Sequence, residues 1–292
     1  MQRSVRPCYN VLMQPTDELV TAIRRALKAV PRIEFSVLFG SAASGRLRQD
    51  SDLDIAVYCE SGGRLEIEEQ REVAEEVAVQ IALERASGRN VDLLVLNRAP
   101  ATVCASALLT GRLLTVGNRE LYTRYFLAVT SAAIDFLETE GEYRAIAARS
   151  RSLSDIDRSR LLRIIDFIAE ELQDAPTFQS VTLDRYGSDR DLRRNIDRWV
   201  EMLINAALDI GKIVLSSMHR PVPQTYGQIL SHLESMPHFS ELSGALSPLA
   251  PLRNLMAHEY LDFRFGRVRW FVDMGAATVG RLAELTHEWL AA

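Results

Sequence analysis

Two aspartates separated by one residue follow a Gly-Ser pair at a distance of ten residues. The run 38–57 reads LFGSAASGRLRQDSDLDIAV, in which Gly40-Ser41 precedes Asp52-Leu53-Asp54. Residues two apart on a strand point to the same face, so Asp52 and Asp54 would present their carboxylates side by side. Two such charges repel each other unless a cation lies between them, and Mg²⁺ takes carboxylate oxygens together with substrate phosphates. The spacing therefore predicts a metal-assisted transfer at phosphorus.

The residues around this pair support the same chemistry. Gly40 lets the backbone approach a phosphate closely, and Ser41 supplies a hydroxyl and an amide donor. A third carboxylate, Asp92, opens the next β-like run in Asn-Val-Asp-Leu-Leu and is a further candidate metal ligand. An isolated Asp-x-Asp is more often an ordinary strand end, but the spacing, the β-like runs on both sides and Asp92 together favour the functional interpretation.

A second candidate site lies near the C-terminus, in the run 251–260, PLRNLMAHEY. Arg253 and His258 would point about 140° apart on a straight helix, so they converge only if the helix ends near His258 or if two copies meet across a dimer axis. A convergent pair can cleave RNA without metal, because histidine moves the proton of a hydroxyl and arginine stabilises the charge that develops on the phosphorus. Tyr260 adds a phenol two residues further on. The structural alternative is that Arg253 pairs with an acid and His258 ends a helix.

Elements of two kinds must position these residues. In the first hundred residues the apolar periodicity predicts helices over 16–30 and 65–85, the second being the longer. It predicts short strands over 33–39, 53–58 and 91–96. After Pro100 no further strand is predicted. Helical patterns follow over 119–139, 153–173, 189–217, 225–235, 239–257 and 267–290. We therefore expect an α/β domain over 1–110, connecting helices over 111–150 and an all-α domain over 151–292.

Composition excludes several classes of protein. The chain has 292 residues, of which 47% are apolar and 25% charged, and a formal net charge of −5. This composition is that of a folded globular chain without bulk positive charge, so any nucleic-acid site must be local. The three cysteines form neither a metal-ligand spacing nor a disulfide framework, and no apolar run is long enough to cross a bilayer. We expect a cytoplasmic protein without a membrane segment.

The first motif resembles a known family. The pattern of Gly40, Ser41, Asp52 and Asp54 is similar to the signature of the nucleotidyltransferase superfamily, and the short α/β domain resembles the minimal nucleotidyltransferases (MNT). The resemblance implies a small mixed sheet, a Gly-Ser turn that holds the triphosphate of ATP, and Mg²⁺ bound by the paired aspartates with Asp92 as the third. Relatives often carry arginine where this chain has Ser44, and Arg46 and Arg48 are the candidates to replace it.

The second motif resembles the HEPN domains that are encoded beside MNT partners. The similarity rests on Arg253-x4-His258-x-Tyr260 and extends over most of 150–290. It implies an all-α bundle that forms a homodimer and in which Arg253 and His258 make up a ribonuclease site acting on RNA. In the paired systems the MNT enzyme silences the HEPN toxin by attaching AMP from ATP to the motif tyrosine, here Tyr260.

The sequence therefore predicts a self-regulated toxin–antitoxin fusion, in which an Mg-ATP-dependent adenylyltransferase modifies Tyr260 and silences a metal-independent endoribonuclease. Asp92 or the metal is the candidate to activate the phenol. The principal alternative is a small-molecule nucleotidyltransferase of the aminoglycoside type, whose helical bundle would bind the substrate. A third possibility, a binding module with a degenerate catalytic domain, is disfavoured by the intact carboxylates.

Overall fold

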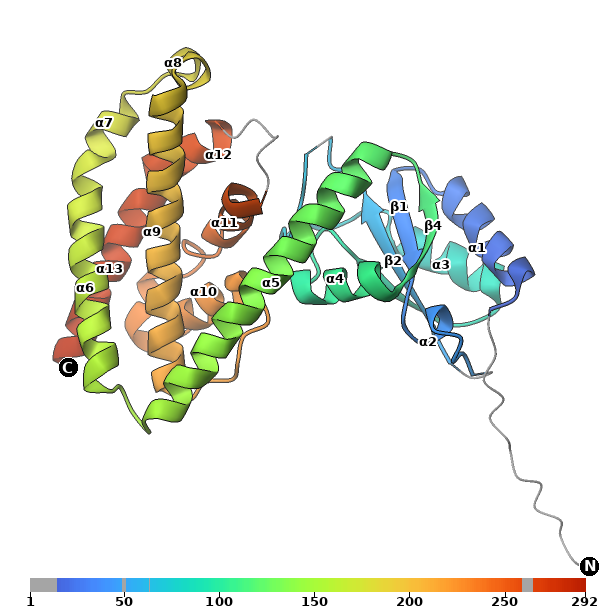
Figure 1. The fold of residues 1–292 in the computed structure, drawn as a ribbon, viewed down its shortest axis with the longest axis horizontal. Coiled ribbons are helices and arrows are strands. Elements are labelled where there is room, and N and C mark those ends of the chain that lie inside the picture. The colour runs from blue at the N-terminus through green and yellow to red at the C-terminus, as the bar shows by residue number, and fades with distance from the viewer. Residues whose placement is uncertain (1–14, 49–50, 63, 259–264) are drawn as a thin grey trace, which may run out of the picture. The chain divides into compact units, whose positions relative to one another are not determined.

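The computed structural model describes residues 15–48, 51–62, 64–258 and 265–292. The chain divides into two compact units, residues 1–130 and 131–292 (Figure 1). Helix α5 (Arg119–Arg149) is continuous through the boundary and contributes residues to both units.

The first unit is a four-stranded mixed sheet with helices on both faces (Figure 1). The strand order is β3-β2-β1-β4, where β1 pairs antiparallel with β2 and β4, and β2 pairs parallel with β3. In chain order the elements are α1 (Asp17–Ala29), β1 (Ile33–Leu38), α2 (Gly40–Ala43), β2 (Leu53–Cys59), α3 (Glu76–Ser87), β3 (Val91–Val95), α4 (Ala101–Thr110) and β4 (Arg112–Val116). The predicted small mixed sheet with helices is thus confirmed.

The central strand β2 is buried along almost its whole length because both of its faces are covered. On one face Ile55 and Val57 pack in a cluster with apolar residues of α1 and α3. On the other face Tyr58 stacks on Phe35, with ring centroids 4.9 Å apart, and Tyr125 of α5 packs against both rings. Such a strand reads as a continuous apolar run, which is why the sequence locates it correctly.

Two predictions for this half were wrong. The helix expected over 65–85 begins only at Glu76, because the preceding loop is held by buried polar groups: the Glu66 carboxylate accepts a hydrogen bond from Asn97 at 2.7 Å, and the Glu68 carboxylate accepts one from the Ala101 amide at 2.9 Å. The stretch expected to begin the connecting helices at residue 111 instead forms β4, an edge strand paired with β1. Its five residues are mostly exposed and show no clear alternation.

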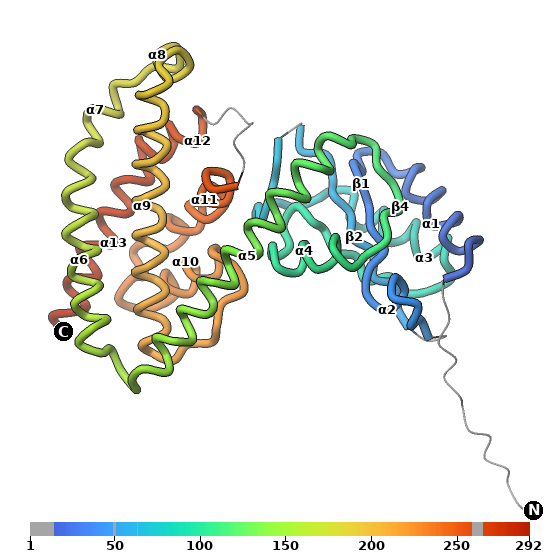
Figure 2. The backbone as a smooth tube through the Cα atoms, in the orientation of Figure 1, coloured from blue at the N-terminus to red at the C-terminus, as the bar shows by residue number. Residues whose placement is uncertain are grey.

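The second unit is a helical bundle built around the long helix α9, Arg190–Ser217 (Figure 2). The buried stripe of α9 includes Trp199, Leu203, Ile210 and Val214. The other elements are α6 (Asp155–Glu171), η1 (Leu172–Asp174), α7 (Ala175–Gln179), α8 (Leu183–Ser188), α10 (Tyr226–Glu234), η2 (Pro237–Leu242), α11 (Leu249–His258), α12 (Phe265–Trp270), the π-helical turn η3 (Phe271–Gly275) and α13 (Ala276–Ala291). The all-α prediction for this half is confirmed.

The boundaries of α9 and α10 match the predicted ranges closely, whereas two other helices are divided. The helix expected over 239–257 breaks between η2 and α11, where Gly244 has a φ of +77° and the buried Glu234 carboxylate accepts hydrogen bonds from the backbone amides of Leu246 and Ser247. The helix expected over 267–290 is interrupted by the π-helical turn η3. The helix expected over 119–139 continues to Arg149.

Candidate functional sites

The Gly-Ser turn lies directly against the second aspartate of the pair. Gly40 follows β1, has a φ of +65° and opens α2; a Cβ atom built on it would lie 2.1 Å from Asp54 Oδ2. The Ser41 backbone amide donates a hydrogen bond to the Asp54 carboxylate. Only glycine permits both the backbone conformation and the close approach, so the residue type at position 40 is fixed by its contact with Asp54.

The three predicted carboxylates are brought to neighbouring strands. Asp54 of β2 is paired in register with Asp92 of the parallel strand β3, and Asp52 precedes it by two residues. Burial is the largest cause that raises the pKa of Asp54, and the negative charges of Asp92 and Asp52 raise it further. This electrostatic cost is the one that a bound cation removes, so the donor set fits Mg²⁺.

The described residues contain no cluster of three or more His, Cys, Asp or Glu side chains already arranged around a metal position. The assignment of Asp52, Asp54 and Asp92 as ligands remains a prediction. One candidate for the missing turn arginine is placed at this loop: the Arg46 Nε donates to Ser44 Oγ at 3.1 Å, and both side chains are exposed. Ser44 in turn donates to the carbonyl oxygen of Gly40 at 3.1 Å.

In the second unit, Arg253 and His258 meet within one chain. Both residues belong to helix α11, and Arg253 Nη1 lies 3.0 Å from His258 Nε2. The two side chains thus meet without a second copy of the chain. Both side chains are only 9% exposed.

An acidic residue that the sequence did not single out completes the cluster. Asp135 of α5 forms an ion pair with Arg253 Nη2, and the same oxygen, Oδ2, lies 3.3 Å from His258 Nε2. The hydrogen bond to His258 is the largest cause that holds the pKa of Asp135 below its usual range, and the Arg253 charge lowers it further. Asp135 lies 118 residues before Arg253, so no local spacing could have indicated the contact.

The Arg253 guanidinium is buried, and Tyr226 and Asn205 contact it in addition to Asp135 and His258. Its Cζ lies 4.4 Å from the centroid of the Tyr226 ring, a cation–π contact, and its Nε donates to Asn205 Oδ1 at 3.5 Å. The Tyr226 hydroxyl in turn lies 3.2 Å from Thr139 Oγ1. A buried cation is tolerated only with such partners, and here they also fix the plane of the guanidinium.

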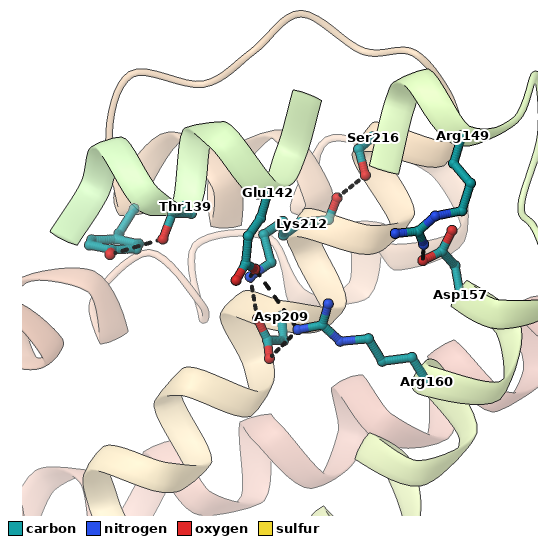
Figure 3. A network of polar contacts seen from close by, with 9 residues as sticks. Thr139, Glu142, Arg149, Asp157, Arg160, Asp209, Lys212 and Ser216 are labelled. Carbon is teal, nitrogen blue, oxygen red and sulfur yellow. Dashed lines mark hydrogen bonds and ion pairs between the residues drawn. The ribbon is translucent and has the colours of Figure 1, made fainter. Parts of the chain in front are cut away.

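Two further polar residues of α5, Thr139 and Glu142, follow Asp135 by one and two turns (Figure 3). Thr139 reaches Tyr226, and Glu142 accepts a hydrogen bond of 2.5 Å from Lys212, whose side chain is 7% exposed. Lys212 also lies 2.6 Å from Asp209, which contacts Arg160 at 3.4 Å. The spacing of four and three residues places these groups on one side of the helix. The side of α5 that contacts Arg253 and His258 through Asp135 therefore also contacts a charged network on α6 and α9.

Tyr260, the predicted site of modification, lies outside the described residues, as does Glu259. The other predicted site residues form two groups. The first unit brings together the predicted nucleotide-binding and metal residues, Gly40, Ser41, Asp52, Asp54 and Asp92. The second unit brings together Arg253 and His258.

The fold and these two clusters define a nucleotidyltransferase domain followed by a helical domain of the HEPN class. Comparison with known families agrees. The model "Polymerase beta, Nucleotidyltransferase" matches residues 21–120, and the model "Ribonuclease HepT-like" matches residues 161–273. The chain thus joins a nucleotidyltransferase domain to a HepT-like domain. No curated protein matches it.

Several solved structures resemble part of the chain. A toxin–antitoxin complex with AMP-PNP is 22% identical, covers 44% of this chain and 94% of its own, and gives a TM-score of 0.35. An MntA–HepT toxin–antitoxin structure is 20% identical, with coverage of 45% and 95% and a TM-score of 0.33. A tri-AMPylated Shewanella oneidensis HEPN toxin in complex with an MNT antitoxin is 21% identical, with coverage of 44% and 92% and a TM-score of 0.32. Among the helices of the described residues, none has the length and apolarity to cross a membrane.

Proposed function

We propose that this chain is a self-regulated toxin–antitoxin fusion: its nucleotidyltransferase domain transfers AMP from ATP to Tyr260, and the modification silences an endoribonuclease formed by Arg253 and His258. The observation that carries the proposal is the convergence of Arg253 and His258 at the end of α11, two residues before Tyr260 in the chain. The nucleotide-bound and AMPylated complexes found among the solved structures are consistent with it.

The cluster supports proton transfer at one atom. His258 Nε2 lies 3.0 Å from Arg253, which can only donate, and 3.3 Å from the Asp135 carboxylate, which can only accept. Neutral histidine accepts a hydrogen bond from Arg253 and protonated histidine donates one to Asp135, so both forms have a partner. This is what a group that takes a proton and returns it requires.

The proposed cleavage follows from these groups. His258 takes the proton of an RNA 2′-hydroxyl, whose oxygen attacks the adjacent phosphorus while the bond to the 5′-oxygen breaks. Arg253 stabilises the negative charge on the phosphorane. The reaction leaves a 2′,3′-cyclic phosphate and a 5′-hydroxyl, and the proton that His258 has taken passes to the leaving 5′-oxygen.

In the nucleotidyltransferase domain the Gly40-Ser41 turn would receive the triphosphate. Asp52, Asp54 and Asp92 would hold Mg²⁺, which neutralises phosphate charge and aligns ATP when bound. The Tyr260 phenol oxygen forms a bond to the α-phosphorus, the bond to the β-phosphate oxygen breaks, and pyrophosphate leaves. The phenol proton passes to a carboxylate, for which Asp92 is the candidate.

The proposed product would block the ribonuclease through charge. AMP on Tyr260 would add a phosphodiester anion two residues from His258 in the chain, and we expect this anion to compete with the RNA phosphate for Arg253. An added charge of this kind acts by occupying the arginine and by repelling RNA.

The intact mass of the protein before and after incubation with Mg-ATP tests the proposal. We expect whole AMP additions in the wild type and none in Tyr260→Phe, together with RNA cleavage by unmodified Asp54→Asn protein that is absent from its His258→Ala derivative. No mass increase in unmodified protein would contradict the transferase, and ATP-dependent modification of an aminoglycoside would favour the small-molecule alternative.

A mixing experiment determines whether AMP passes between chains. Asp54→Asn protein lacks the transferase but keeps the acceptor, whereas Tyr260→Phe protein has the reverse defect. Modification of Asp54→Asn chains in the mixture would show transfer between molecules, as expected if the HepT-like domain forms a homodimer. Sedimentation analysis of the same samples reports the number of chains directly.

A further inference from the structure

A cavity of about 490 Å³ lies between α6 and α9 in the second unit. Its lining consists of one face of each helix: Arg160, Arg163, Ile164 and Phe167 from α6, and Arg198, Met202, Asn205, Ala206 and Asp209 from α9. Pockets for small ligands have volumes of about 300–1,000 Å³, so the space is adequate for one nucleotide.

The lining is electrically unbalanced. Three arginines face one carboxylate, Asp209, which contacts Arg160 at 3.4 Å (Figure 3). Arg198 is exposed and pairs with Glu201 at 3.0 Å, an ion pair that water and salt weaken. Arg163 is exposed, and in the described part of the chain no ion pair joins it. The cavity therefore offers at least two guanidinium groups to an anion, and arginine suits phosphate because its donors form a planar fork.

The rest of the lining is apolar. Ile164, Phe167 and Met202 are half-buried and present hydrocarbon or aromatic surface to the same space as the arginines. A nucleotide combines these two requirements, since its base stacks on aromatic or apolar side chains while its phosphates meet basic ones. Inorganic phosphate alone would leave the apolar surface uncovered.

The cavity adjoins the reactive pair through one residue. Asn205 lines the cavity and its Oδ1 accepts a hydrogen bond from Arg253 Nε at 3.5 Å. Arg253 in turn contacts His258. A ligand in the cavity is thus separated from the guanidinium of Arg253 by a single side chain, which is the position expected of a nucleotide next to the bond being cut.

We propose that this cavity, through Arg163, Arg198 and Phe167, binds one nucleotide of the RNA strand beside the scissile phosphate. The proposal rests on the ribonuclease activity proposed above and adds the subsite that holds its substrate. Each phosphate contact on a single strand contributes about 0.7 to the slope of log affinity against log salt, so removing two contacts should lower the slope by about 1.4 and the affinity on the order of ten-fold at physiological salt.

Binding of a 2′-O-methyl RNA oligonucleotide, measured by fluorescence anisotropy at several salt concentrations, tests the proposal without cleavage, because the attacking hydroxyl is blocked. We expect the pair Arg163→Gln/Arg198→Gln to lose affinity and slope as stated, and Phe167→Leu to lose affinity without a change in slope. The matched control is Arg185→Gln/Arg190→Gln, which removes the same charge from two exposed arginines that do not line the cavity. The control should lose less than about two-fold.

Three results would overturn the proposal: equal losses in the two double variants, no loss in either, or a change in sedimentation coefficient that shows the face to be a contact between copies of the chain. Saturable binding of free AMP that the cavity variants abolish, with unchanged RNA binding, would assign the cavity to a free nucleotide instead. Because these readouts measure binding, they remain valid if no cleavage is observed, and failure of the proposed ribonuclease is then distinguishable from failure of the subsite.

Discussion

Replacement of Asp135 by asparagine tests whether the third member of the cluster positions the reactive pair. The carboxylate contacts both Arg253 and His258 through one oxygen, and its side chain is 32% exposed. A hydrogen bond to a charged group contributes about 1.5–3 kcal/mol, and partial exposure places this one near the lower half of that range. A loss of about 2 kcal/mol corresponds to about a 30-fold lower rate of RNA cleavage.

The assay is single-turnover RNA cleavage by protein that carries Asp54→Asn, so that AMP transfer does not interfere. The matched control is Glu138→Gln, which removes the same charge from the same helix at an exposed position one turn away. We expect Glu138→Gln to cleave at the parent rate and Asp135→Asn to cleave about 30-fold more slowly.

The pH dependence separates positioning from simple loss of structure. The pKa of Asp135 is lowered in the folded protein, so its carboxylate contributes stability that is present above the unfolded value, 3.8, and is lost as the pH falls through the lowered folded value. The difference in unfolding free energy between the parent and Asp135→Asn should therefore be largest near neutral pH and shrink below pH 3.8. Equal or faster cleavage by Asp135→Asn would refute the reasoning and show that the carboxylate obstructs the pair.

Three further predictions concern both units. Gly40→Ala should abolish AMP incorporation, measured by intact mass, because its Cβ would collide with Asp54; Gly88→Ala has nearly the same φ, +66°, but open space around it and should retain activity. Asp54→Asn should raise the melting temperature in EDTA at neutral pH, because the raised pKa means that ionisation of this carboxyl opposes folding, and the gain should disappear below pH 3.8; Mg²⁺ should stabilise the wild type alone. A lower melting temperature for Asp54→Asn would contradict this electrostatic account. Tyr226→Phe keeps the aromatic face against Arg253 and should cleave RNA within about three-fold of the parent, whereas Tyr226→Leu loses a contact of about 1 kcal/mol and should be several-fold slower. Equal rates for the two variants would show that the cation–π contact has no role.

The sequence predicted those features that depend on local pattern. The Gly40–Asp54 spacing, the buried run of β2 and the apolar stripe of α9 all lie within single elements or adjacent ones, and each was found where expected. The convergence of Arg253 and His258 was left open between two routes, since it depended on where α11 ends.

The features that escaped prediction depend on distant partners. The loop before α3 resembles a helix in its periodicity, but buried hydrogen bonds to Glu66 and Glu68 hold it in another conformation. The edge strand β4 is specified by its pairing with β1 rather than by its own residues. Asp135 could be identified only once α5 was seen to bring it to Arg253.

The continuity of α5 has a consequence for how the two activities could be separated by proteolysis. Tyr125 packs in the core of the nucleotidyltransferase domain, where its hydroxyl donates to the Leu96 carbonyl oxygen at 2.8 Å, and Asp135 holds the reactive pair of the HepT-like domain. A protease that cut at residue 150, where this helix has ended, would release a helical fragment without Asp135. Such a cut would remove from Arg253 and His258 the carboxylate that contacts both, so the contacts of this pair depend on α5 as well as on the helices that follow it.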